Sequence, residues 1–185
     1  MTAVNGVTAT DLTDRIRRAI RDVPDFPKPG IIFKDITPLL ADASLFRETT
    51  DAMADGFLVE RITHVVAIES RGFILGAPVA QRLNAGFVPV RKAGKLPAKT
   101  VAEEYALEYG TDILEVHADA CEWARRPRVL IVDDVLATGG TADATRRLIE
   151  GLGAEVVGFS FLIALSFLPG VARLRDRSPR ALVTY

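Results

Sequence analysis

The sequence contains little of what would indicate a secreted, nucleic-acid-binding or membrane protein. Cys121 is the only cysteine, so no disulfide can form within the chain. A formal net charge of −1 gives no overall electrostatic reason to bind nucleic acid or an anionic membrane. The longest apolar run, Val156–Leu168, is shorter than the about 18–20 residues that a helix needs to cross a bilayer. The first residues lack a basic segment followed by an apolar one, so we expect no signal peptide and a cytoplasmic protein.

What is present favours one soluble α/β domain covering residues 1–185. Apolar residues make up 49% of the 185, enough for a sizeable core. Short β-rich runs alternate with segments of helical periodicity, which predicts a parallel sheet with helices on both faces. Helices are expected at 11–21, 44–60 (with Ser44 as its cap), 72–83 and 141–152, and strands at 62–68, 86–92, 113–117, 128–134, 154–165 and 181–185.

Two segments fit neither pattern. Residues 24–29 hold three prolines within six residues, which excludes a regular helix there. Residues 94–110 show no clean periodicity, and a long irregular segment in a compact domain is usually functional or disordered. We therefore expect a loop at 94–110, with Glu103 and Glu104 as solvated carboxylates within it.

The stretch VLIVDDVLATGGTADATRRLIE, residues 129–150, carries the strongest chemical signal. Its apolar run is typical of a strand buried on both faces, and the run ends in Asp133 and Asp134. Ligands of open α/β sheets bind beyond the carboxyl ends of the strands. The two adjacent carboxylates therefore indicate a site that binds hydroxyl groups or a cation.

The turn after these acids is suited to a phosphate group. Gly139 and Gly140 permit a tight turn, and backbone amides at the following helix N-terminus face an anion. Thr138 and Thr141 add hydroxyl donors. A Walker-type loop would have Lys after its last Gly, whereas Thr141 stands there, so ATPase chemistry is disfavoured. The alternative interpretation is a solvated strand end followed by an ordinary turn.

The same stretch resembles the phosphoribosyl pyrophosphate signature of the type I phosphoribosyltransferases. In that signature four hydrophobic residues precede two acids and a small-Thr-Gly-Gly-Thr loop. The resemblance implies that Asp133 and Asp134 meet the ribose hydroxyls, directly or through water and magnesium. It also implies that the loop amides bind the 5-phosphate, a role that falls here to Ala137, Thr138, Gly139, Gly140 and Thr141.

Three further stretches resemble the matching blocks of the adenine phosphoribosyltransferase family. Because their order and spacing also fit, the resemblance covers nearly the whole chain from Asp11. It implies the type I phosphoribosyltransferase fold with a small N-terminal hood, mainly residues 1–40, a mobile catalytic loop at about 94–110, and a homodimer. The three blocks are DFPKPGIIFKDITPLL (25–40), ESRGFILGAPVA (69–80) and RKAGKLPAKTVAEEYALEYG (91–110).

In that family N9 of adenine displaces pyrophosphate from phosphoribosyl pyrophosphate, and AMP forms. Positive charge develops on the ribose and negative charge on the leaving group, so both ends need electrostatic stabilisation. The resemblance implies Mg²⁺ as the cofactor, held by the substrate rather than directly by the protein, with Asp133 and Asp134 nearby. It assigns the pyrophosphate side to Arg71, Arg91, Lys92 and Lys95, which could otherwise be a solvated basic turn.

The end of the loop, YALEYG, places Glu108 and Tyr109 on the family's catalytic motif. The resemblance implies that Glu108 manages the purine proton, that Arg71 takes part in catalysis and that Tyr109 contacts the phosphoribosyl group. The peptide before the Arg of the SRG block is often cis in the family, which would here be Ser70–Arg71.

The proline-rich block resembles the family's adenine pocket. Ile32 and Lys34 would offer main-chain hydrogen bonds and Phe33 a ring for stacking, with Val135 on the other side of the base. Taken alone, IIF is more often a fragment of a core strand. In the 6-oxopurine branch the residue before the Thr-Gly is an Asp near N7 of the base, and here it is Ala137. The sequence therefore favours adenine.

Two other functions stay open at this point. One is a regulator that senses phosphoribosyl pyrophosphate, which would need a nucleic-acid surface that the near-neutral chain does not show. The other is a transferase for xanthine or orotate. His64 and His117 have no metal-ligand spacing with Cys121, so structural roles are expected for both.

Overall fold

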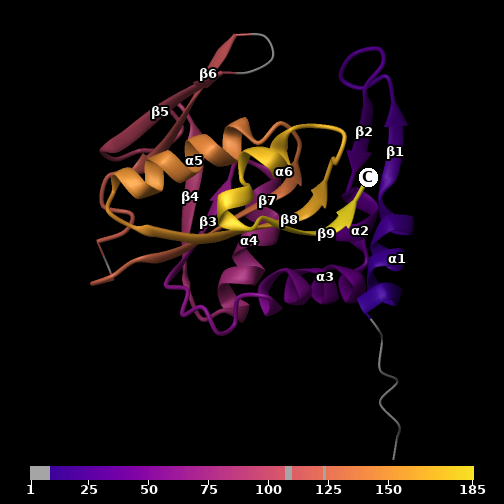
Figure 1. Cartoon of the computed structure of the whole chain (residues 1–185), viewed down its shortest axis with the longest axis horizontal. Helices are drawn as coiled ribbons and strands as arrows, with labels where there is room; N and C mark the ends of the chain where they lie inside the picture. The colour runs from indigo at the N-terminus through magenta and orange to yellow at the C-terminus, as the bar shows by residue number, and fades with distance from the viewer. Residues whose placement is uncertain (1–8, 107–109, 123) are drawn as a thin grey trace, which may run out of the picture. The chain divides into compact units, whose positions relative to one another are not determined.

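The computed structural model describes residues 9–106, 110–122 and 124–185 of the chain (Figure 1). The chain divides into two compact units, Met1–Thr49 and Thr50–Tyr185, and the boundary falls within helix α3. The predicted hood, residues 1–40, lies in the first unit. Among the described residues, no helix is long and apolar enough to span a membrane.

The first unit is a small helix-and-hairpin assembly. Its elements are α1 (Ala9–Ala19), β1 (Arg21–Pro24), β2 (Ile32–Asp35), α2 (Thr37–Ala41) and the first half of α3 (Ala43–Asp55). The predicted first helix is confirmed, and Ile16 and Ile20 are both buried as their spacing indicated. The proline-rich segment forms the antiparallel turn between β1 and β2, a pairing that the sequence did not predict.

The second predicted helix is confirmed, but its boundaries differ from the expected ones. The carboxylate of Asp42, not the hydroxyl of Ser44, caps α3. Asp42 Oδ1 accepts hydrogen bonds from the amides of Ser44 and Leu45, each at 3.0 Å. The Asx geometry of Asp42 satisfies two of the free amides at the helix start, which a Ser inside the first turn cannot do. The helix ends at Asp55, next to Gly56, rather than at Glu60.

The second unit is built on a seven-stranded sheet of order β5-β6-β4-β3-β7-β8-β9. Five strands run parallel to one another: β4, β3, β7, β8 and β9. Strands β5 and β6 add an antiparallel edge. The strands are β3 (His64–Ile68), β4 (Gly86–Lys92), β5 (Thr100–Ala106), β6 (Thr111–His117), β7 (Arg128–Leu136), β8 (Glu155–Ala164) and β9 (Arg180–Thr184).

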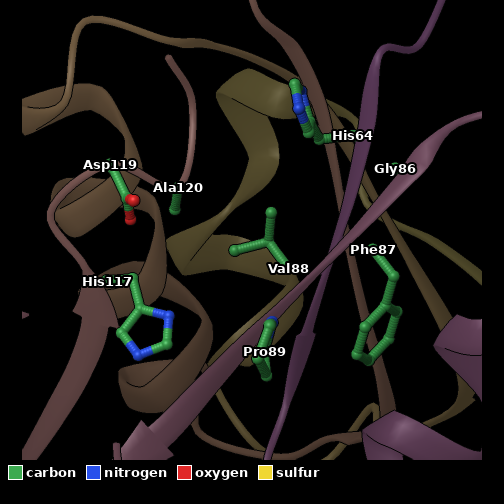
Figure 2. A pocket seen from close by; sticks show the side chains of 8 residues that line it. All are labelled: His64, Gly86, Phe87, Val88, Pro89, His117, Asp119 and Ala120. Carbon is green, nitrogen blue, oxygen red and sulfur yellow. The ribbon is translucent and has the colours of Figure 1, made fainter. Parts of the chain in front are cut away.

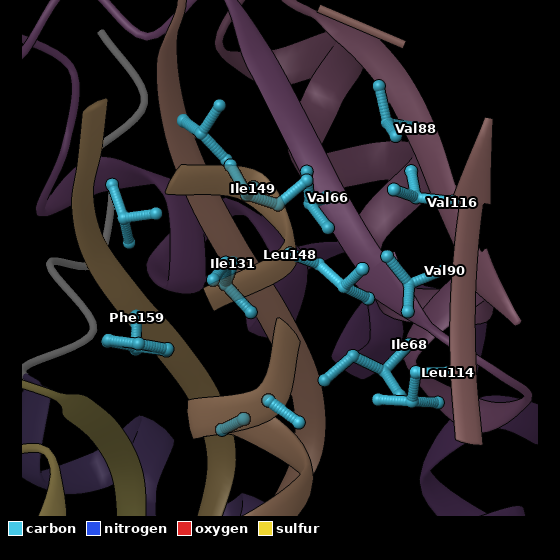
Figure 3. Packing of buried hydrophobic residues seen from close by; sticks show 14 of the residues in the cluster. Val66, Ile68, Val88, Val90, Leu114, Val116, Ile131, Leu148, Ile149 and Phe159 are labelled. Atoms are coloured by element: carbon cyan, nitrogen blue, oxygen red, sulfur yellow. The ribbon is translucent and has the colours of Figure 1, made fainter. Parts of the chain in front are cut away.

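Helices cover both faces of this sheet, as predicted. Alternate strand residues such as Val66 and Ile131 form a cluster with Leu148 and Ile149 of α5 (Gly140–Gly151), which Figure 3 shows. The opposite face carries α4 (Arg71–Arg82), where a Cβ on Gly76 would lie 2.6 Å from the Ala67 side chain. Successive strand residues point to opposite faces, so the two helices lie on opposite sides. Short helices α6 (Gly170–Arg173) and η1 (Arg175–Arg177) precede β9.

The expectation of an irregular loop throughout 94–110 is wrong for its second half, where Thr100–Ala106 is strand β5. Val101, Glu103 and Tyr105 are wholly or partly buried, whereas Ala102 and Glu104 are exposed. A carboxylate on the inner face hides the apolar alternation by which a strand is recognised. Glu103 is also paired as well as partly solvated, because it forms an ion pair with Arg147 of α5 while 30% of its side chain stays exposed.

Candidate active site

Asp133 and Asp134 lie near the carboxyl end of β7, as predicted, and they interact with one another. The amide of Asp134 donates a hydrogen bond to Asp133 Oδ1 at 2.9 Å. Arg71, the first residue of α4, places its Nε 2.8 Å from Asp134 Oδ2. The Asp134 side chain is only 7% exposed, whereas that of Arg71 is 34% exposed, so water is kept from the carboxylate but not from the whole ion pair. The structure thus brings together the SRG block and the acid pair.

Their surroundings disfavour two negative charges. Burial and the neighbouring charge of Asp134 raise the pKa of Asp133. Burial also raises the pKa of Asp134, although the guanidinium of Arg71 opposes the rise. One guanidinium beside two carboxyl groups leaves a deficit of positive charge at this point. A cation or a hydroxyl-bearing ligand brought here would relieve it.

Gly72 allows the close approach of α4 to the acid pair. A Cβ at this position would lie 2.8 Å from Asp133 Oδ1 and 3.1 Å from the carbonyl oxygen of Val132. Contacts below 3.0 Å require the surrounding atoms to move. Gly72 is therefore part of the site's geometry, although the SRG resemblance pointed only to its neighbour Arg71.

The predicted phosphate loop joins β7 to α5. Gly139 is the residue before the helix and has the left-handed conformation, φ 77° and ψ 2°, which glycine adopts without strain. The loop lines a cavity of about 70 Å³ that also includes Asp133 and Val135. The other loop residues around this cavity are Ala137, Thr138, Gly140 and Thr141. The amides at the start of α5 and the threonine hydroxyls suit this cavity to an anion.

Gly170 supports the loop from behind, a feature that the sequence did not reveal. Its amide donates to the carbonyl oxygen of Ala137 at 3.0 Å. A Cβ on Gly170 would lie 2.3 Å from that oxygen, and one on Gly139 would lie 3.1 Å from the Cα of Gly170. The only local signal was the Pro169-Gly170 dipeptide, which indicates a turn without saying what it packs against.

A second cavity, of about 310 Å³, gathers several predicted residues from four separate segments. Arg71, Lys92, the two acids and Thr141 all line it. The remaining lining residues are Ile68, Glu69, Ser70, Tyr105 and Leu114. Positive side chains, paired carboxylates and the edge of the phosphate loop therefore face one space at the carboxyl ends of β3 and β7.

The Arg91 side chain is tied to the turn that precedes α4. Its Nη2 and Nε lie 3.1 and 3.2 Å from the two carboxylate oxygens of Glu69, and its Nη1 donates to the carbonyl oxygen of Lys95 at 2.9 Å. The hydrogen bond from Arg91 lowers the pKa of Glu69, which also accepts from the amide of Lys92 at 3.1 Å. Arg91 thus links the RKAGK segment to the SRG turn.

That turn contains a non-proline cis peptide bond, but not where it was expected. The cis bond joins Glu69 to Ser70, one residue before the expected Ser70–Arg71 bond. No proline marks the position, so the sequence carries no signal that could place the bond to the residue. A second cis bond joins Phe26 to Pro27.

Other predicted residues are not among the described residues that line the 310 Å³ cavity. Glu108 and Tyr109 are outside the described residues. Ile32, Phe33 and Lys34 belong to β2 of the first unit, where Phe33 packs edge-to-face on Phe26 with ring centroids 5.2 Å apart. Their roles toward a base stay predictions.

A further cavity of about 370 Å³ lies at the opposite ends of the parallel strands. Figure 2 shows His64 and His117 on different strands of its wall, together with Asp119 and Phe87. Strands β3 and β4 begin here, at His64 and Gly86, so the cavity is remote from the carboxyl ends where ligands of such sheets bind. His64 Nδ1 lies 2.9 Å from the Thr63 hydroxyl, and burial lowers the pKa of this imidazole. No group of three or more His, Cys, Asp or Glu suited to a metal occurs within the described ranges.

Comparison with known proteins identifies the family. The profile of the phosphoribosyl transferase domain matches residues 43–177. The adenine phosphoribosyltransferase of Myxococcus xanthus is 56% identical over 182 residues, which are 98% of either chain. The chain belongs to the adenine phosphoribosyltransferase family. The crystal structure of the family member from Rhodothermus marinus covers 96% of this chain and 100% of its own, with 54% identity and a TM-score of 0.89.

A more distant adenine phosphoribosyltransferase, from Saccharomyces cerevisiae, is 36% identical and has a TM-score of 0.84. The match covers 93% of this chain and 97% of the yeast chain, whose structure is a complex with adenine and an imino-altritol bisphosphate. The type I phosphoribosyltransferase fold is thus confirmed. These relatives support neither a regulator nor a transferase for xanthine or orotate.

Proposed function

We propose that this chain transfers the 5-phosphoribosyl group of phosphoribosyl pyrophosphate to N9 of adenine, forming AMP and pyrophosphate, a purine salvage reaction. One observation carries the proposal. The acid pair, Arg71, Lys92 and the phosphate loop meet at the carboxyl ends of β3 and β7. Names of close relatives and the adenine bound to the yeast protein support the choice of base.

The chain's own groups suit the charges of the reaction. The loop from Ala137 to Thr141 would hold the 5-phosphate through backbone amides and hydroxyls. Asp133 and Asp134 would accept hydrogen bonds from the ribose hydroxyls and lie close to the positive charge that develops on the ring. Arg71 and Lys92 would face the departing pyrophosphate, with Arg91 and Lys95 completing the basic segment.

The acid pair also fits a magnesium ion. Carboxylate oxygens are the protein ligands that Mg²⁺ prefers. Burial raises the pKa of both acids, and the neighbouring charge of Asp134 adds to the rise at Asp133, so a nearby cation would favour their charged forms. We propose that oxygens of the substrate hold the ion and that Asp133 and Asp134 lie near it without binding it directly. The ion would neutralise charge on the leaving group.

We further propose Glu108 as the group that manages the purine proton, with Tyr109 beside the phosphoribosyl group. The family's motif supports these roles, and Ala137 supplies no carboxylate for the purpose. Glu108→Gln should lower kcat by about 10²–10⁴-fold, the usual contribution of general acid–base catalysis, with little change in the affinity for phosphoribosyl pyrophosphate. Near-normal kcat would assign the proton to another group.

For the base, we propose main-chain hydrogen bonds from Ile32 and Lys34 and stacking on Phe33. Val135, which lines the loop cavity, is proposed as a second contact to adenine. Backbone donors and acceptors at fixed positions distinguish an amino from an oxo group, since the wrong edge leaves buried polar groups without partners.

We propose a homodimer in the cytoplasm. Ile74 and Phe87 are 43% and 39% exposed, and Phe87 packs edge-to-face on Phe73, so α4 and β4 present apolar surface suited to a second copy. Sedimentation equilibrium should give about twice the mass of one chain, and a single-chain mass would contradict the dimer.

The proposed cytoplasmic location rests on the charge of the substrate. Phosphoribosyl pyrophosphate carries several phosphate charges and does not cross a bilayer, so the enzyme should be in the compartment where this substrate is made. Cell fractionation followed by an activity assay tests the location.

The direct experiment follows AMP formation from adenine and phosphoribosyl pyrophosphate, with and without a chelator. We expect AMP and pyrophosphate in equal amounts in the presence of Mg²⁺ and loss of activity in excess chelator, restored by added Mg²⁺. Product formation without adenine consumption would contradict the transfer reaction. Full activity in excess chelator would contradict only the magnesium assignment.

A further inference from the structure

Asp112, at the start of β6, holds the ammonium of Lys92. The distance from Lys92 Nζ to Asp112 Oδ2 is 3.2 Å. The hydroxyl of Tyr105 lies 3.4 Å from the same oxygen, and the amide of Ile113 donates to Asp112 Oδ1 at 2.9 Å. Asp112 and Tyr105 face each other in the β5–β6 register, so the hairpin itself brings the two together.

The two partners differ in freedom of movement. The Lys92 side chain is 60% exposed, whereas that of Asp112 is 26% exposed and anchored by two further donors. Partial burial raises the pKa of Asp112, but the Ile113 amide and Lys92 outweigh it and lower the pKa overall. Asp112 is therefore a fixed negative charge near neutral pH, while Lys92 can swing away on its flexible stem.

Tyr105 links this pair to the phosphate loop. Its side chain is buried, its hydroxyl lies 3.4 Å from Asp112 Oδ2, and it lines the same cavity as Thr141 of the phosphate loop. Burial raises the pKa of Tyr105, and the Thr141 side chain opposes that rise. Both Tyr105 and Lys92 line the 310 Å³ cavity together with Arg71. A pyrophosphate bound there would therefore compete with Asp112 for one ammonium group.

We propose that Asp112 is a positioning residue that competes with pyrophosphate for Lys92 and thereby limits the affinity of the enzyme for this product. The inference rests on the proposed function, because it requires pyrophosphate as a ligand of the cavity. In this role Asp112 pairs again with Lys92 as pyrophosphate leaves. The positive side chains that stabilise pyrophosphate as a leaving group then do not hold it in the cavity as product. Tyr105 moderates the competition by sharing the carboxylate.

The proposal predicts opposite effects for two conservative substitutions. Asp112→Asn removes the competing charge and should tighten pyrophosphate binding by about 5–50-fold, the range expected for one nearby charge in a partly solvated site. Tyr105→Phe removes a donor from Asp112, which then holds Lys92 more strongly, so pyrophosphate should bind about 2–3-fold more weakly. General damage to the hairpin would weaken binding in both variants.

The experiment measures the dissociation constant of magnesium pyrophosphate by calorimetry and its inhibition of AMP formation, for wild type, D112N and Y105F. Glu104→Gln is the matched control, because it removes one negative charge from the exposed side of the same hairpin. Its pyrophosphate affinity should stay within about twofold of wild type. In a Lys92→Met background the gain from D112N should fall below about threefold.

Tighter pyrophosphate binding in D112N that depends on Lys92 supports the proposal. Unchanged or weaker binding in D112N, or an equal gain without Lys92, overturns it while leaving the transferase function intact. If wild type binds no pyrophosphate and forms no AMP, the proposed function itself fails, and this inference fails with it.

Discussion

At the scale of single residues, the acid pair shows a conflict between stability and ligand binding. Asp133 and Asp134 are neighbours on β7 with one guanidinium beside them, and burial raises the pKa of each carboxyl. The folded chain therefore binds protons at these groups more tightly than the unfolded chain does. The free energy of unfolding consequently falls as pH rises from the unfolded pKa through the higher folded pKa, and is level above it.

Asp133→Asn removes this penalty without changing the size of the side chain. In the absence of ligand and Mg²⁺, the variant should be more stable than wild type at pH 7.5 by about 1–3 kcal/mol, a typical cost of a poorly compensated buried polar group. The gain should shrink as pH falls through the folded pKa of the wild-type carboxyl. Urea unfolding at pH 7.5 and pH 5 measures it, and kcat should fall strongly.

Glu104→Gln serves as the control for net charge, because Glu104 is exposed and no change in stability beyond about 0.5 kcal/mol is expected. If Asp133→Asn were less stable than wild type at pH 7.5, the charged acid pair would stabilise the fold. Arg71 would then be enough to balance the two carboxylates, and they would not need a nearby magnesium ion.

At the scale of elements, the phosphate loop depends on α6 as well as on α5. Gly170 begins α6, and its amide hydrogen-bonds to the carbonyl of Ala137 in the loop. A methyl group on Gly170 would lie 2.3 Å from that carbonyl oxygen, and neither backbone can yield without moving the loop. Substrate binding should therefore be sensitive to a residue with no assigned contact to the substrate.

Gly170→Ala should raise the KM for phosphoribosyl pyrophosphate by at least about tenfold and cost about 1–3 kcal/mol of stability, as overpacking usually does. Steady-state kinetics and urea unfolding measure the two effects. Gly151→Ala, at the end of α5, is the matched control, since nothing lies within 4 Å of its added Cβ. An unchanged KM in Gly170→Ala would show that the phosphate loop does not depend on α6.

Helices and strands with a regular apolar pattern were predictable from the sequence, and the others were not. Strands β3, β4 and β7 and helices α4 and α5 were predicted because their apolar patterns are regular and their ends carry turn residues. Strand β5 was missed because Glu103 faces inward to Arg147, a partner remote in the chain. The cap Asp42 was missed because Ser and Asp both suit a helix start, and the folded backbone decides which one accepts the amides.

The site was predictable where one contiguous motif builds it. Asp133, Asp134 and the loop from Ala137 follow each other in the chain, so their proximity is a property of one strand, turn and helix. Gly72, Gly170 and Asp112 act across segments that only the folded sheet brings together. Such contacts leave no periodic or local pattern in a single sequence.

As a complete enzyme, this chain is a transferase for adenine rather than for a 6-oxopurine. The absence of a carboxylate at Ala137 and the main-chain groups proposed at Ile32 and Lys34 both favour the amino edge. Each buried group left without a partner costs about 1–3 kcal/mol, so two mismatches correspond to about 2–6 kcal/mol, or roughly 30- to 10⁴-fold in catalytic efficiency.

The most direct test measures kcat/KM for adenine and for hypoxanthine side by side, at saturating phosphoribosyl pyrophosphate and Mg²⁺. Adenine should be converted to AMP with an efficiency about 30- to 10⁴-fold above that for hypoxanthine, and guanine should be equally poor. Comparable values for adenine and hypoxanthine would contradict the adenine assignment.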